Sequence, residues 1–373
     1  MRIVFDAQIF CAQRFGGISR YFASLTRELA EMDGFVPRIV APLHVNNYAA
    51  HLPRALVVGR KVEWLGKARV AVGAMSCLLG ELVQYKLRPD IVHRTYYYPQ
   101  PRLPRSSRTI VSVYDMTYER FPQHFRTDDP VPRWKQAAVK RADHVVCISE
   151  NTRRDVLELC DIAPERVSVT YLGYDSLATL LVQEDRAAAR ESLGGSNRPY
   201  LLYVGSRSGC KNFPALLRAF AGSHRLRQDF TLVCFGGGDF TAEEATLIGK
   251  LGAFQCVRHA SGGDAALARA YRGAELFVYP SLYEGFGIPP LEAMSLDCPV
   301  ACSNSSSLPE VVGEAAATFE PTDEDAIRDT LERTLESSTR RQELVALGRI
   351  RKNLFSWRRC ALETAQIYRS LTA

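Results

Sequence analysis

Short apolar runs alternate with longer amphipathic segments along most of the chain. Apolar runs without polar alternation are typical of strands that are covered on both faces. The first half holds five such runs, at 2–6, 36–41, 91–94, 109–114 and 145–149. The second half holds five more, at 200–205, 230–235, 256–258, 276–279 and 300–303. Since strand–helix–strand repetition is typical of parallel doubly wound sheets, the pattern predicts an α/β fold.

The alternation is interrupted at 178–199. A charged helical pattern, QEDRAAARESL, ends there in a Gly-Gly-Ser-Asn stretch, and Pro199 opens the next strand. We therefore expect two Rossmann-like domains, an N-terminal domain over 1–185 and a C-terminal domain over 196–355. The last helical segment, 356–373, has an apolar face that fits either domain.

Composition fits this organisation. The chain has 373 residues, of which 46% are hydrophobic and 24% charged, as in soluble globular proteins with two domains. Its ten cysteines run from Cys11 to Cys360 without a CxxC pair, which favours reduced thiols over disulfides or a zinc site. The chain has no apolar stretch of roughly 18 residues, and its N-terminus, MRIVFDAQIF, has a strand pattern rather than that of a signal peptide. We therefore expect a cytoplasmic protein, either unattached or docked on the inner face of the membrane.

The net charge of +6 arises in the first half of the chain. Residues 1–190 hold 27 Lys and Arg against 20 Asp and Glu, whereas the remainder holds 20 against 21. A basic half either attracts an anionic partner, such as a phosphate-bearing lipid or a membrane surface, or reflects scattered surface arginines. Nucleic acid is not expected, since the sequence has no RNP-like motif, basic helix or zinc module. The segment 67–86 has an apolar face that suits either the membrane surface or the protein core.

Two carboxylates mark the string SLYEGFGIPPLEAM at 281–294, which follows a predicted strand and enters a helix at its prolines. Glu284 is expected in the loop and Glu292 about one turn into the helix. Carboxylates do not help to bind phosphate, but they accept hydrogen bonds from sugar hydroxyls. Alternatively, Glu292 complements the helix dipole and Glu284 is solvated. Gly285 and Gly287 would let a bulky ligand approach the backbone.

With its flanks, this string resembles the E-x7-E signature of retaining glycosyltransferases with the GT-B fold, in particular glycosyltransferase family 4 (GT4). AYRGAELFVYP before it, and PVACSNSSSLPEVVGEAA and PTDEDAI after it, are similar to the C-terminal domain of that family in order and spacing. In the first half, FGGISRYFASLTREL, PDIVHRTYYYP and SVYDMTYERFP resemble a mannosyltransferase-like subset. The resemblance covers nearly the whole chain and implies two domains that face each other across a cleft.

The resemblance also implies a role for each carboxylate of the signature. Glu284 would hold hydroxyls of the donor sugar, and Glu292 would accept hydrogen bonds from the ribose hydroxyls. Backbone N–H groups around Phe286 and Gly287 would approach the sugar and the β-phosphate. In the serine-rich loop before the next helix, Ser306-Ser307 is a candidate for contact with the pyrophosphate.

A second motif, YVGSRSGCKNF at 203–213, leaves the first strand of the predicted C-terminal domain. A small-residue turn at Gly205 followed by two cations suits a diphosphate, because charge develops on the β-phosphate during transfer. Arg207 can chelate it bidentately, and Lys211 can act as a point charge. The resemblance supports Lys211, whereas the arginine of the family more often lies one residue further from the lysine. Alternatively, both residues are solvated loop cations.

Candidates for the acceptor side lie in the N-terminal domain. Gly16, assigned to the acceptor side, and Gly17, assigned to the donor, precede a helix and would form an anion-accepting N-terminus; in relatives this loop faces the donor phosphates and the acceptor. Tyr114 and Asp115 follow a strand, and many relatives have a histidine in place of Tyr114 that contacts the donor sugar. Asp115 either orients the acceptor hydroxyl or holds a turn. His93 ends another strand and is either functional or a buried, hydrogen-bonded histidine.

Neither a metal nor a redox cofactor is expected. Asp323, Glu324 and Asp325 resemble a metal-binding DxD motif but open a predicted helix, where acidic residues stabilise the N-terminus. No His/Cys cluster has metal-ligand spacing, and GGGDF at 236–240 fails the GxGxxG pattern of dinucleotide sites. We therefore expect metal-independent catalysis with the nucleotide sugar as co-substrate. Asp297 stands where relatives often have glycine and has no assigned role.

Together these features predict a retaining glycosyltransferase that moves a hexose from a nucleotide-diphosphate sugar in surface polysaccharide or O-antigen synthesis. The N-terminal motifs favour mannose, and hence GDP-mannose, and the expected acceptor is a glycan or a polyprenyl-diphosphate-linked glycan. Two alternatives stay open: a transferase that uses a UDP-sugar, and a sugar-nucleotide epimerase with the GT-B fold, which needs no acceptor. No residue is an obvious nucleophile, which suits front-face attack with the leaving phosphate as base.

Overall fold

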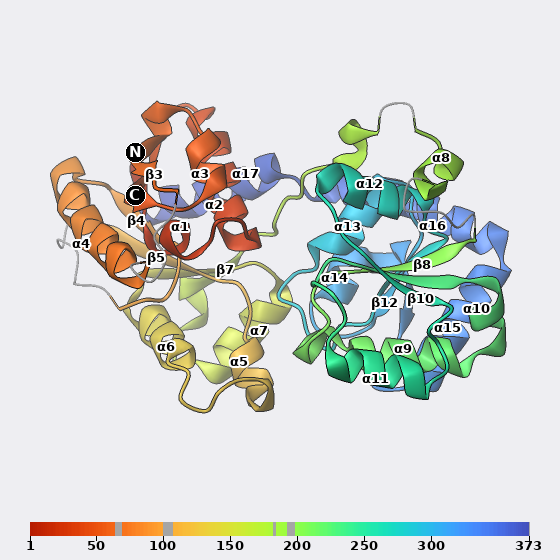
Figure 1. Ribbon diagram of the computed structural model, residues 1–373. Coiled ribbons are helices and arrows are strands. Elements are labelled where there is room, and N and C mark those ends of the chain that lie inside the picture. Colours follow the sequence, from red (N-terminus) through yellow and green to blue (C-terminus); the bar gives the residue numbers. More distant parts are fainter. Residues whose placement is uncertain (64–68, 100–106, 182–183, 192–197, 373) are drawn as a thin grey trace. The chain divides into compact units, whose positions relative to one another are not determined.

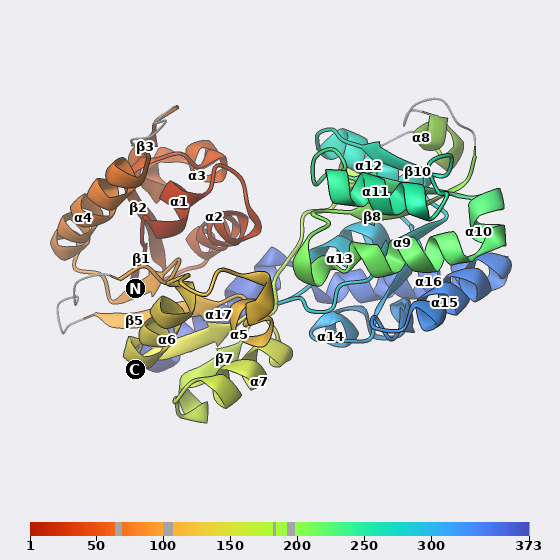
Figure 2. The ribbon, with the colours of Figure 1, turned by 60° about the horizontal axis from the view of Figure 1, so that its bottom comes forward.

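The chain forms two compact units, each built around its own parallel sheet (Figure 1). The computed structural model describes residues 1–373 except 64–68, 100–106, 182–183, 192–197 and 373. The first unit holds Met1–Gly173 together with Ser356–Ala373, and the second holds Tyr174–Phe355. In each unit helices lie on both sides of the sheet (Figures 1 and 2), as the α/β prediction requires.

The boundary between the units lies at Gly173, earlier than the predicted end of the N-terminal domain at 185. The segment that follows packs on the second unit. Glu184 forms an ion pair with Arg269 (2.7 Å), and Arg190 Nε donates to Gly273 O (3.2 Å). The charged helix that the sequence places in a linker is therefore part of the second unit.

The first unit has a sheet of seven parallel strands in the order β3-β2-β1-β4-β5-β6-β7. The strands are β1 (Arg2–Phe5), β2 (Val36–His44), β3 (Val57–Lys61), β4 (Ile91–Arg94), β5 (Arg108–Val113), β6 (His144–Cys147) and β7 (Val167–Val169). The helices are α1 (Gln8–Ala12), α2 (Gly17–Ala30), α3 (Asn47–His51), α4 (Arg69–Leu87), α5 (Thr117–Arg120), α6 (Val131–Arg141), α7 (Glu150–Leu159) and α17 (Trp357–Thr372). Five strands coincide with predicted runs, and the two edge strands, β3 and β7, do not.

The second unit has six parallel strands in the order β10-β9-β8-β11-β12-β13. The strands are β8 (Tyr200–Val204), β9 (Thr231–Phe235), β10 (Val257–Ala260), β11 (Leu276–Tyr279), β12 (Val300–Ser303) and β13 (Ala317–Phe319). The helices are α8 (Arg186–Glu191), α9 (Phe213–Gly222), α10 (His224–Asp229), α11 (Ala242–Lys250), α12 (Asp264–Gly273), α13 (Ile288–Ser295), α14 (Leu308–Val312), α15 (Glu324–Glu336) and α16 (Ser338–Arg351). All but the edge strand β13 coincide with predicted runs.

The C-terminal helix α17 returns to the first unit, which is one of its two predicted placements. The ring of Trp357 lies 6.3 Å from that of Tyr21 on α2, measured between centroids. Tyr368 is fully buried, and its hydroxyl lies 2.6 Å from Nδ1 of His93. A Cβ at Gly173 would lie 2.2 Å from the backbone nitrogen of Trp357. Only glycine therefore fits where the chain passes the start of this helix.

Candidate functional site

In the second unit, three loops with predicted site residues leave neighbouring strands at their carboxyl ends. β8, β11 and β12 are adjacent in the sheet, and the strand order reverses between β8 and β11. Open α/β sheets bind ligands at such a reversal. The fold thus brings Gly205, Lys211, Glu284 and Ser306 to one edge of one sheet.

Lys211 and Glu284 form a direct ion pair, with Nζ 2.6 Å from Oε1. The side chain of Lys211 is 33% exposed and that of Glu284 is 11% exposed. The backbone links the same two loops, since Leu282 N donates to Cys210 O (2.8 Å). Tyr279, the last residue of β11, also hydrogen-bonds to the Glu284 carboxylate. Burial, and then the charge of Glu284, hold the pKa of Tyr279 well above its usual range, so its hydroxyl remains a donor.

Two serines of the loop after β12 hold the backbone of the Glu284 loop. Ser306 Oγ accepts from Glu284 N (2.9 Å). Ser307 Oγ lies 2.9 Å from Glu284 O and 2.8 Å from Phe286 O. Phe286 is buried, and its ring meets that of Phe355 at 78° with centroids 5.6 Å apart. These serine hydroxyls therefore fix the loop that carries the first carboxylate of the signature.

Glycines keep backbone accessible in this region. Gly205 has φ of 117°, and no described atom lies within 4 Å of the position of a Cβ. Gly287 is the N-cap of α13 with φ of 109°, and a Cβ there would lie 2.7 Å from Leu308 Cδ2. Gly285, between Glu284 and Phe286, is partly exposed. Gly205 and Gly285 therefore leave backbone open to a ligand, whereas Gly287 is required by its φ and by the close approach of Leu308.

Glu292 is the fifth residue of α13 and is 8% exposed. The hydroxyl of Tyr271 lies 3.4 Å from its Oε2. Burial, and then the charge of Glu292, raise the pKa of Tyr271 well above its usual range. The tyrosine therefore donates to the carboxylate and orients it.

Arg207 is not available to a ligand. Its side chain is 2% exposed, and its guanidinium carbon lies 4.9 Å from the ring centroid of Phe240. The guanidinium donates to one carboxylate and three backbone carbonyls, those of Glu244 (2.9 Å), Gly236 (2.9 Å), Gly238 (2.9 Å) and Asp239 (2.8 Å). Positive φ at each of the glycines 236–238 shapes the turn that presents these carbonyls. In this structure the guanidinium nitrogens of Arg207 are engaged within their own unit, so the predicted chelation of the donor diphosphate would require Arg207 to give up these partners.

His93 lies in the core of the first unit rather than on an acceptor surface. It is fully buried, with Nδ1 2.6 Å from the Tyr368 hydroxyl and Nε2 2.9 Å from the Ser112 hydroxyl. Burial lowers the pKa of His93 to about 3, so the ring is neutral at neutral pH. Tyr114 is also buried, and its hydroxyl donates to Thr95 O (2.8 Å). Of the two interpretations of His93, the buried, hydrogen-bonded one is correct.

Gly16 and Gly17 begin a helix as predicted. Gly16 is the N-cap of α2, and Gly17, its first residue, is exposed. The side chain of Gln13 covers this end: Oε1 accepts from Ser19 N (3.3 Å), and a Cβ on Gly16 would lie 2.2 Å from that oxygen. An uncharged side chain of the protein thus supplies an acceptor to this helix N-terminus.

Asp115 holds a turn and keeps an exposed carboxylate. Its Oδ1 accepts from Thr117 N (2.9 Å), and its backbone oxygen accepts from Lys135 Nζ (2.9 Å). The side chain is 39% exposed. The turn role is therefore present, and the carboxylate is still accessible to an acceptor hydroxyl.

The remaining sequence features have structural roles. Within the described residues, no group of three or more His, Cys, Asp or Glu side chains is arranged to hold a metal ion. Asp323 is the N-cap of α15, and its Oδ1 accepts from Asp325 N (2.9 Å). Asp297 has φ of 57°, which explains why a glycine suits this position, and it pairs with Arg349 (2.7 Å).

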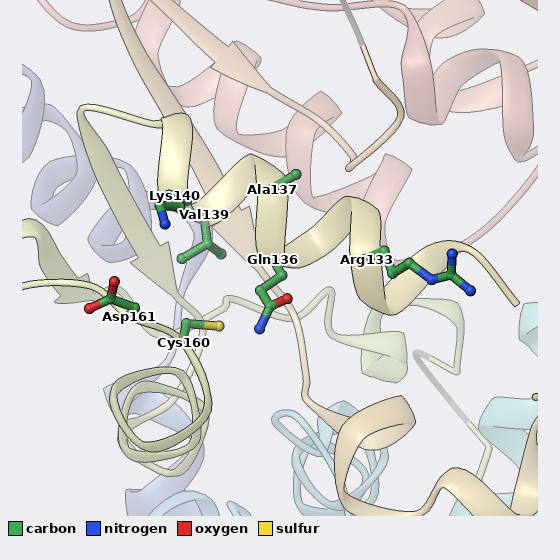
Figure 3. Close-up of a pocket in the computed structure, with 7 residues that line it drawn as sticks. All are labelled: Arg133, Gln136, Ala137, Val139, Lys140, Cys160 and Asp161. Carbon is green, nitrogen blue, oxygen red and sulfur yellow. The ribbon is translucent and has the colours of Figure 1, made fainter.

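A pocket of about 310 Å³ lies between α6 and the end of α7, and none of the predicted site residues lines it (Figure 3). Its lining consists of Arg133, Gln136, Ala137, Val139, Lys140, Cys160 and Asp161. Burial raises the pKa of Cys160 to about 11, so its thiol stays protonated. Charges of both signs line this pocket, and we assign it no role.

Comparisons with known proteins identify the family. The profile described as "Glycosyltransferase Family 4" matches residues 15–176, and that described as "Glycosyl transferases group 1" matches residues 185–351. The chain belongs to glycosyltransferase family 4. It is therefore a glycosyltransferase, and its two doubly wound units are those of the GT-B fold.

Individual relatives agree with this assignment. This glycosyltransferase is 28% identical to O-antigen chain mannosyltransferase B of Escherichia coli, over 95% of this chain and 96% of that protein. It is 30% identical to the serotype-specific mannosyltransferase WbdA of Escherichia coli, over 60% of this chain and 28% of that longer protein. The structure of sucrose-phosphate synthase from Thermosynechococcus elongatus matches with a TM-score of 0.76 at 20% identity, covering 99% of this chain and 98% of that one.

Side chains outside the predicted set also contact the candidate residues of this glycosyltransferase, among them Gln13, Tyr271 and Tyr279. Tyr279 carries a signal in the sequence, because it ends a predicted strand whose loop bears Glu284. Tyr271 lies in the string AYRGAELFVYP, but nothing in that string indicates its contact with Glu292, and Gln13 lies outside the quoted strings.

Replacing Arg207 by alanine is expected to lower the free energy of unfolding by about 3 kcal/mol, because Glu244 and three carbonyls lose their donor. The matched control Arg218→Ala loses an exposed ion pair with Glu324 and should cost less than about 1 kcal/mol. Urea unfolding followed by circular dichroism measures both. If Arg207→Ala and Arg218→Ala lower the free energy of unfolding by the same small amount, Arg207 does not hold the glycine turn.

His93 makes stability depend on pH. Its folded pKa of about 3 lies below the ordinary 6.5, so the unfolded chain takes up the proton first as pH falls. The stability that the neutral ring contributes is therefore full above about pH 6.5 and is lost between about pH 6.5 and 3. In His93→Gln, the slope of unfolding free energy against pH in this window should fall by up to about 1.4 kcal/mol per pH unit. Urea titrations across this window test it, with exposed His124→Gln as control; an unchanged slope in His93→Gln would contradict a neutral buried ring.

Proposed function

We propose that this chain is a retaining hexosyltransferase that moves mannose from GDP-mannose onto a lipid-linked glycan. The observation that carries the proposal is the Lys211–Glu284 pair, with Nζ and Oε1 2.6 Å apart at the strand ends of the second unit. Sugar transfer from a nucleoside diphosphate needs a cation for the leaving phosphate and an acceptor for the sugar hydroxyls in one place. The two Escherichia coli relatives are mannosyltransferases, and the name of one includes O-antigen; both facts support this donor sugar and product class.

Each donor-side residue has a separate role in the proposal. Lys211 has a flexible, partly exposed side chain and turns from Glu284 toward the β-phosphate when the donor binds. Glu284 then accepts hydroxyls of the sugar, and Glu292 accepts those of the ribose. The phosphates meet the N-terminus of α13 and nearby backbone, at Gly205, Gly285, Phe286 and Gly287. Arg207 is left out of this set, because its donors are used elsewhere.

The chemistry follows from where charge develops. As the bond between the anomeric carbon and the diphosphate breaks, positive charge grows on the sugar ring and negative charge on the β-phosphate. Lys211 and the N-terminus of α13 stabilise the negative charge, and we propose that no metal is needed. The acceptor hydroxyl attacks on the face that the phosphate leaves, and the phosphate takes up its proton. The anomeric configuration is thereby retained.

The first unit is proposed to bind the acceptor. Asp115, with its 39% exposed side chain, accepts a hydrogen bond from the attacking hydroxyl. Gly16 and Gly17 lie at the N-terminus of α2, where Gln13 gives way to an anionic group of the ligands. Tyr114 does not replace the histidine of relatives as a donor to the sugar, because its hydroxyl proton is bound by Thr95 O.

Thermal shifts with GDP-mannose, other GDP-, UDP- and dTDP-sugars and free diphosphates test the donor site. GDP-mannose should raise the Tm of the wild type, and Lys211→Ala should lose most of this shift, whereas the exposed-lysine control Lys250→Ala should keep it. Glu284→Gln should lower kcat for transfer at least about 100-fold. No shift with any nucleotide sugar would contradict the proposal. A larger shift with UDP-sugars would favour a UDP-sugar transferase, and conversion of the donor without an acceptor would favour an epimerase.

We also propose that α4 contacts the inner surface of the cytoplasmic membrane. One face of this helix packs on the first sheet, where Ser76 Oγ accepts from Leu43 N (3.0 Å). The opposite face exposes five large apolar side chains, those of Met75 (46%), Leu78 (61%), Leu79 (40%), Leu82 (59%) and Tyr85 (67%). Of the two interpretations of the segment 67–86, core packing describes one face, and the exposed apolar face supports the proposed membrane contact; Lys67 lies outside the described residues. Exposed Lys86 and Arg88 at the end of the helix suit anionic headgroups. Across the described ranges, no helix is long and apolar enough to cross a bilayer.

Sedimentation with vesicles that contain anionic phospholipid tests this contact. The wild type should co-sediment, and the double variant Leu78→Glu, Leu82→Glu should bind at least about tenfold more weakly, because two leucines no longer enter the interface. Leu362→Glu, at a 47% exposed leucine of α17, is the matched control and should bind as the wild type does. Equal binding by the double variant and the control would remove α4 from the membrane contact.

A further inference from the structure

Five partly exposed aromatic side chains, here called the aromatic surface, gather on the first unit. They are Tyr96, Tyr98, Tyr118, Phe125 and Trp134. The strands that lead into this region, β4 and β5, are neighbours in the sheet, and α5 and α6 lie side by side (Figures 1 and 2). None of these rings has a role in the donor site or in the membrane contact proposed above.

The rings contact one another and form a connected apolar surface that solvent reaches. The ring planes of Tyr98 and Trp134 make an angle of 78°, with centroids 5.5 Å apart. Those of Tyr98 and Tyr96 make an angle of 57°, with centroids 5.1 Å apart. Tyr118 and Phe125 are stacked at 20° with centroids 3.9 Å apart. The charges of Tyr98 and Tyr118 affect each other's surroundings, so the Tyr118–Phe125 pair lies near the group of Tyr96, Tyr98 and Trp134. Tyr98 is 37% exposed, unlike a ring of the core.

Polar contacts hold the aromatic surface in place. Gln8 binds the backbone of Tyr98 twice: its Oε1 accepts from Tyr98 N (2.8 Å), and its Nε2 donates to Tyr98 O (3.3 Å). Lys135 is buried next to Trp134 in the sequence and donates to Asp115 O and Glu119 Oε2, at 2.9 Å each. Side chains that are fixed beforehand lose little conformational entropy when a ligand binds.

The charges around the aromatic surface favour a neutral, hydroxyl-rich ligand. After the larger effect of burial, Asp129 and Asp115 raise the pKa of Tyr118, so both carboxylates lie near it. Two of the cations in this part of the chain are already paired, Lys135 with Glu119 and Arg126 with Asp128. Binding of a phosphate group needs cationic side chains that are free to reorient toward it. Binding of a hydrocarbon chain gains nothing from carboxylates, which lose hydration when an apolar group covers them. A saccharide fits both features, because its hydroxyls donate to carboxylates and its C–H face packs on aromatic rings.

We propose that the aromatic surface binds the neutral saccharide part of the acceptor, with a sugar ring packed on Trp134 and Tyr98 and a hydroxyl bound by Asp115. The inference rests on the proposed function, since it specifies which chemical part of the acceptor the first unit recognises. The diphosphate and lipid of the acceptor are left to other parts of the protein in this proposal, because the described carboxylates beside the rings, Asp115 and Asp129, do not suit either of them.

Ligand-observed NMR on the full chain, without donor, tests the inference. The probes are methyl α-mannoside, the methyl glycoside of an α-linked mannobiose, and the methyl glycosides of N-acetylglucosamine and galactose. In a saturation-transfer experiment, magnetisation should pass from the protein to the C–H protons of at least one probe. Trp134→Ala should raise the Kd of the protein for that probe about tenfold. Trp134→Phe keeps a ring and should raise the Kd less than about threefold. Phe254→Ala removes a 66% exposed ring of the second unit and should leave the Kd unchanged.

The thermal shift with GDP-mannose, recorded on the same variants, separates this inference from the proposed function. Loss of saccharide affinity in Trp134→Ala with the nucleotide shift retained supports the inference. A wild type that binds no saccharide probe, or a Trp134→Ala variant that binds as tightly as the wild type, overturns it even where the nucleotide shift is present. Farnesyl phosphate is the competing probe: displacement of the saccharide from this surface by it would assign the rings to the lipid part and overturn the inference. Saccharide binding without any nucleotide shift would contradict only the proposed function.

Discussion

The ion pair between Lys211 and Glu284 links the loops that follow β8 and β11. Because these strands are neighbours in the sheet, both charges lie at the same edge of it. Ser306 and Ser307 hold the backbone of the glutamate from a third loop, and Tyr279 holds its carboxylate. A pair whose lysine is one-third exposed adds little to stability, since water screens it. Its partners on three loops are therefore better explained by the reaction, which needs both charges in place before the donor arrives.

The two cations of the motif YVGSRSGCKNF show how position decides the role of a charge. Arg207 presents a planar fork, which matches a glutamate and three carbonyls that the glycines 236–238 turn toward it. Lys211 has a flexible stem and a compact charge, and it is bound by one carboxylate only at the edge of the site. The arginine thus shapes the loop beside the site, and the proposed exchange of partner for a phosphate falls to the lysine, whose side chain is 33% exposed.

Strands and motifs could be predicted where the signal is local. Central strands such as β9 and β11 are buried along their whole length and appear as continuous apolar runs. The edge strands β3, β7 and β13 are short or partly exposed, so their residues form no such run. In the site, the loops after β8 and β11 could be placed from strand ends and glycines alone. The roles of Arg207 and His93 could not, because they depend on partners 37 and 275 residues away, Glu244 and Tyr368.

Within the first unit, a buried charge network connects the proposed membrane helix to the aromatic surface. Glu81 on α4 pairs with Arg94 (2.6 Å), and Arg94 pairs with Asp6 (3.3 Å). The Asp6 carboxylate accepts from both the backbone and the hydroxyl of Thr95, which directly precedes Tyr96. Burial raises the pKa of Asp6 against the opposing effect of Arg94, and removal of Arg94 would leave both Asp6 and Glu81 without their cation. Since short polar contacts link the two surfaces, the distance between them is fixed. If the two proposals hold together, a glycan anchored in the bilayer meets the aromatic rings at a set height above it, and this height limits the length of acceptor that reaches the rings.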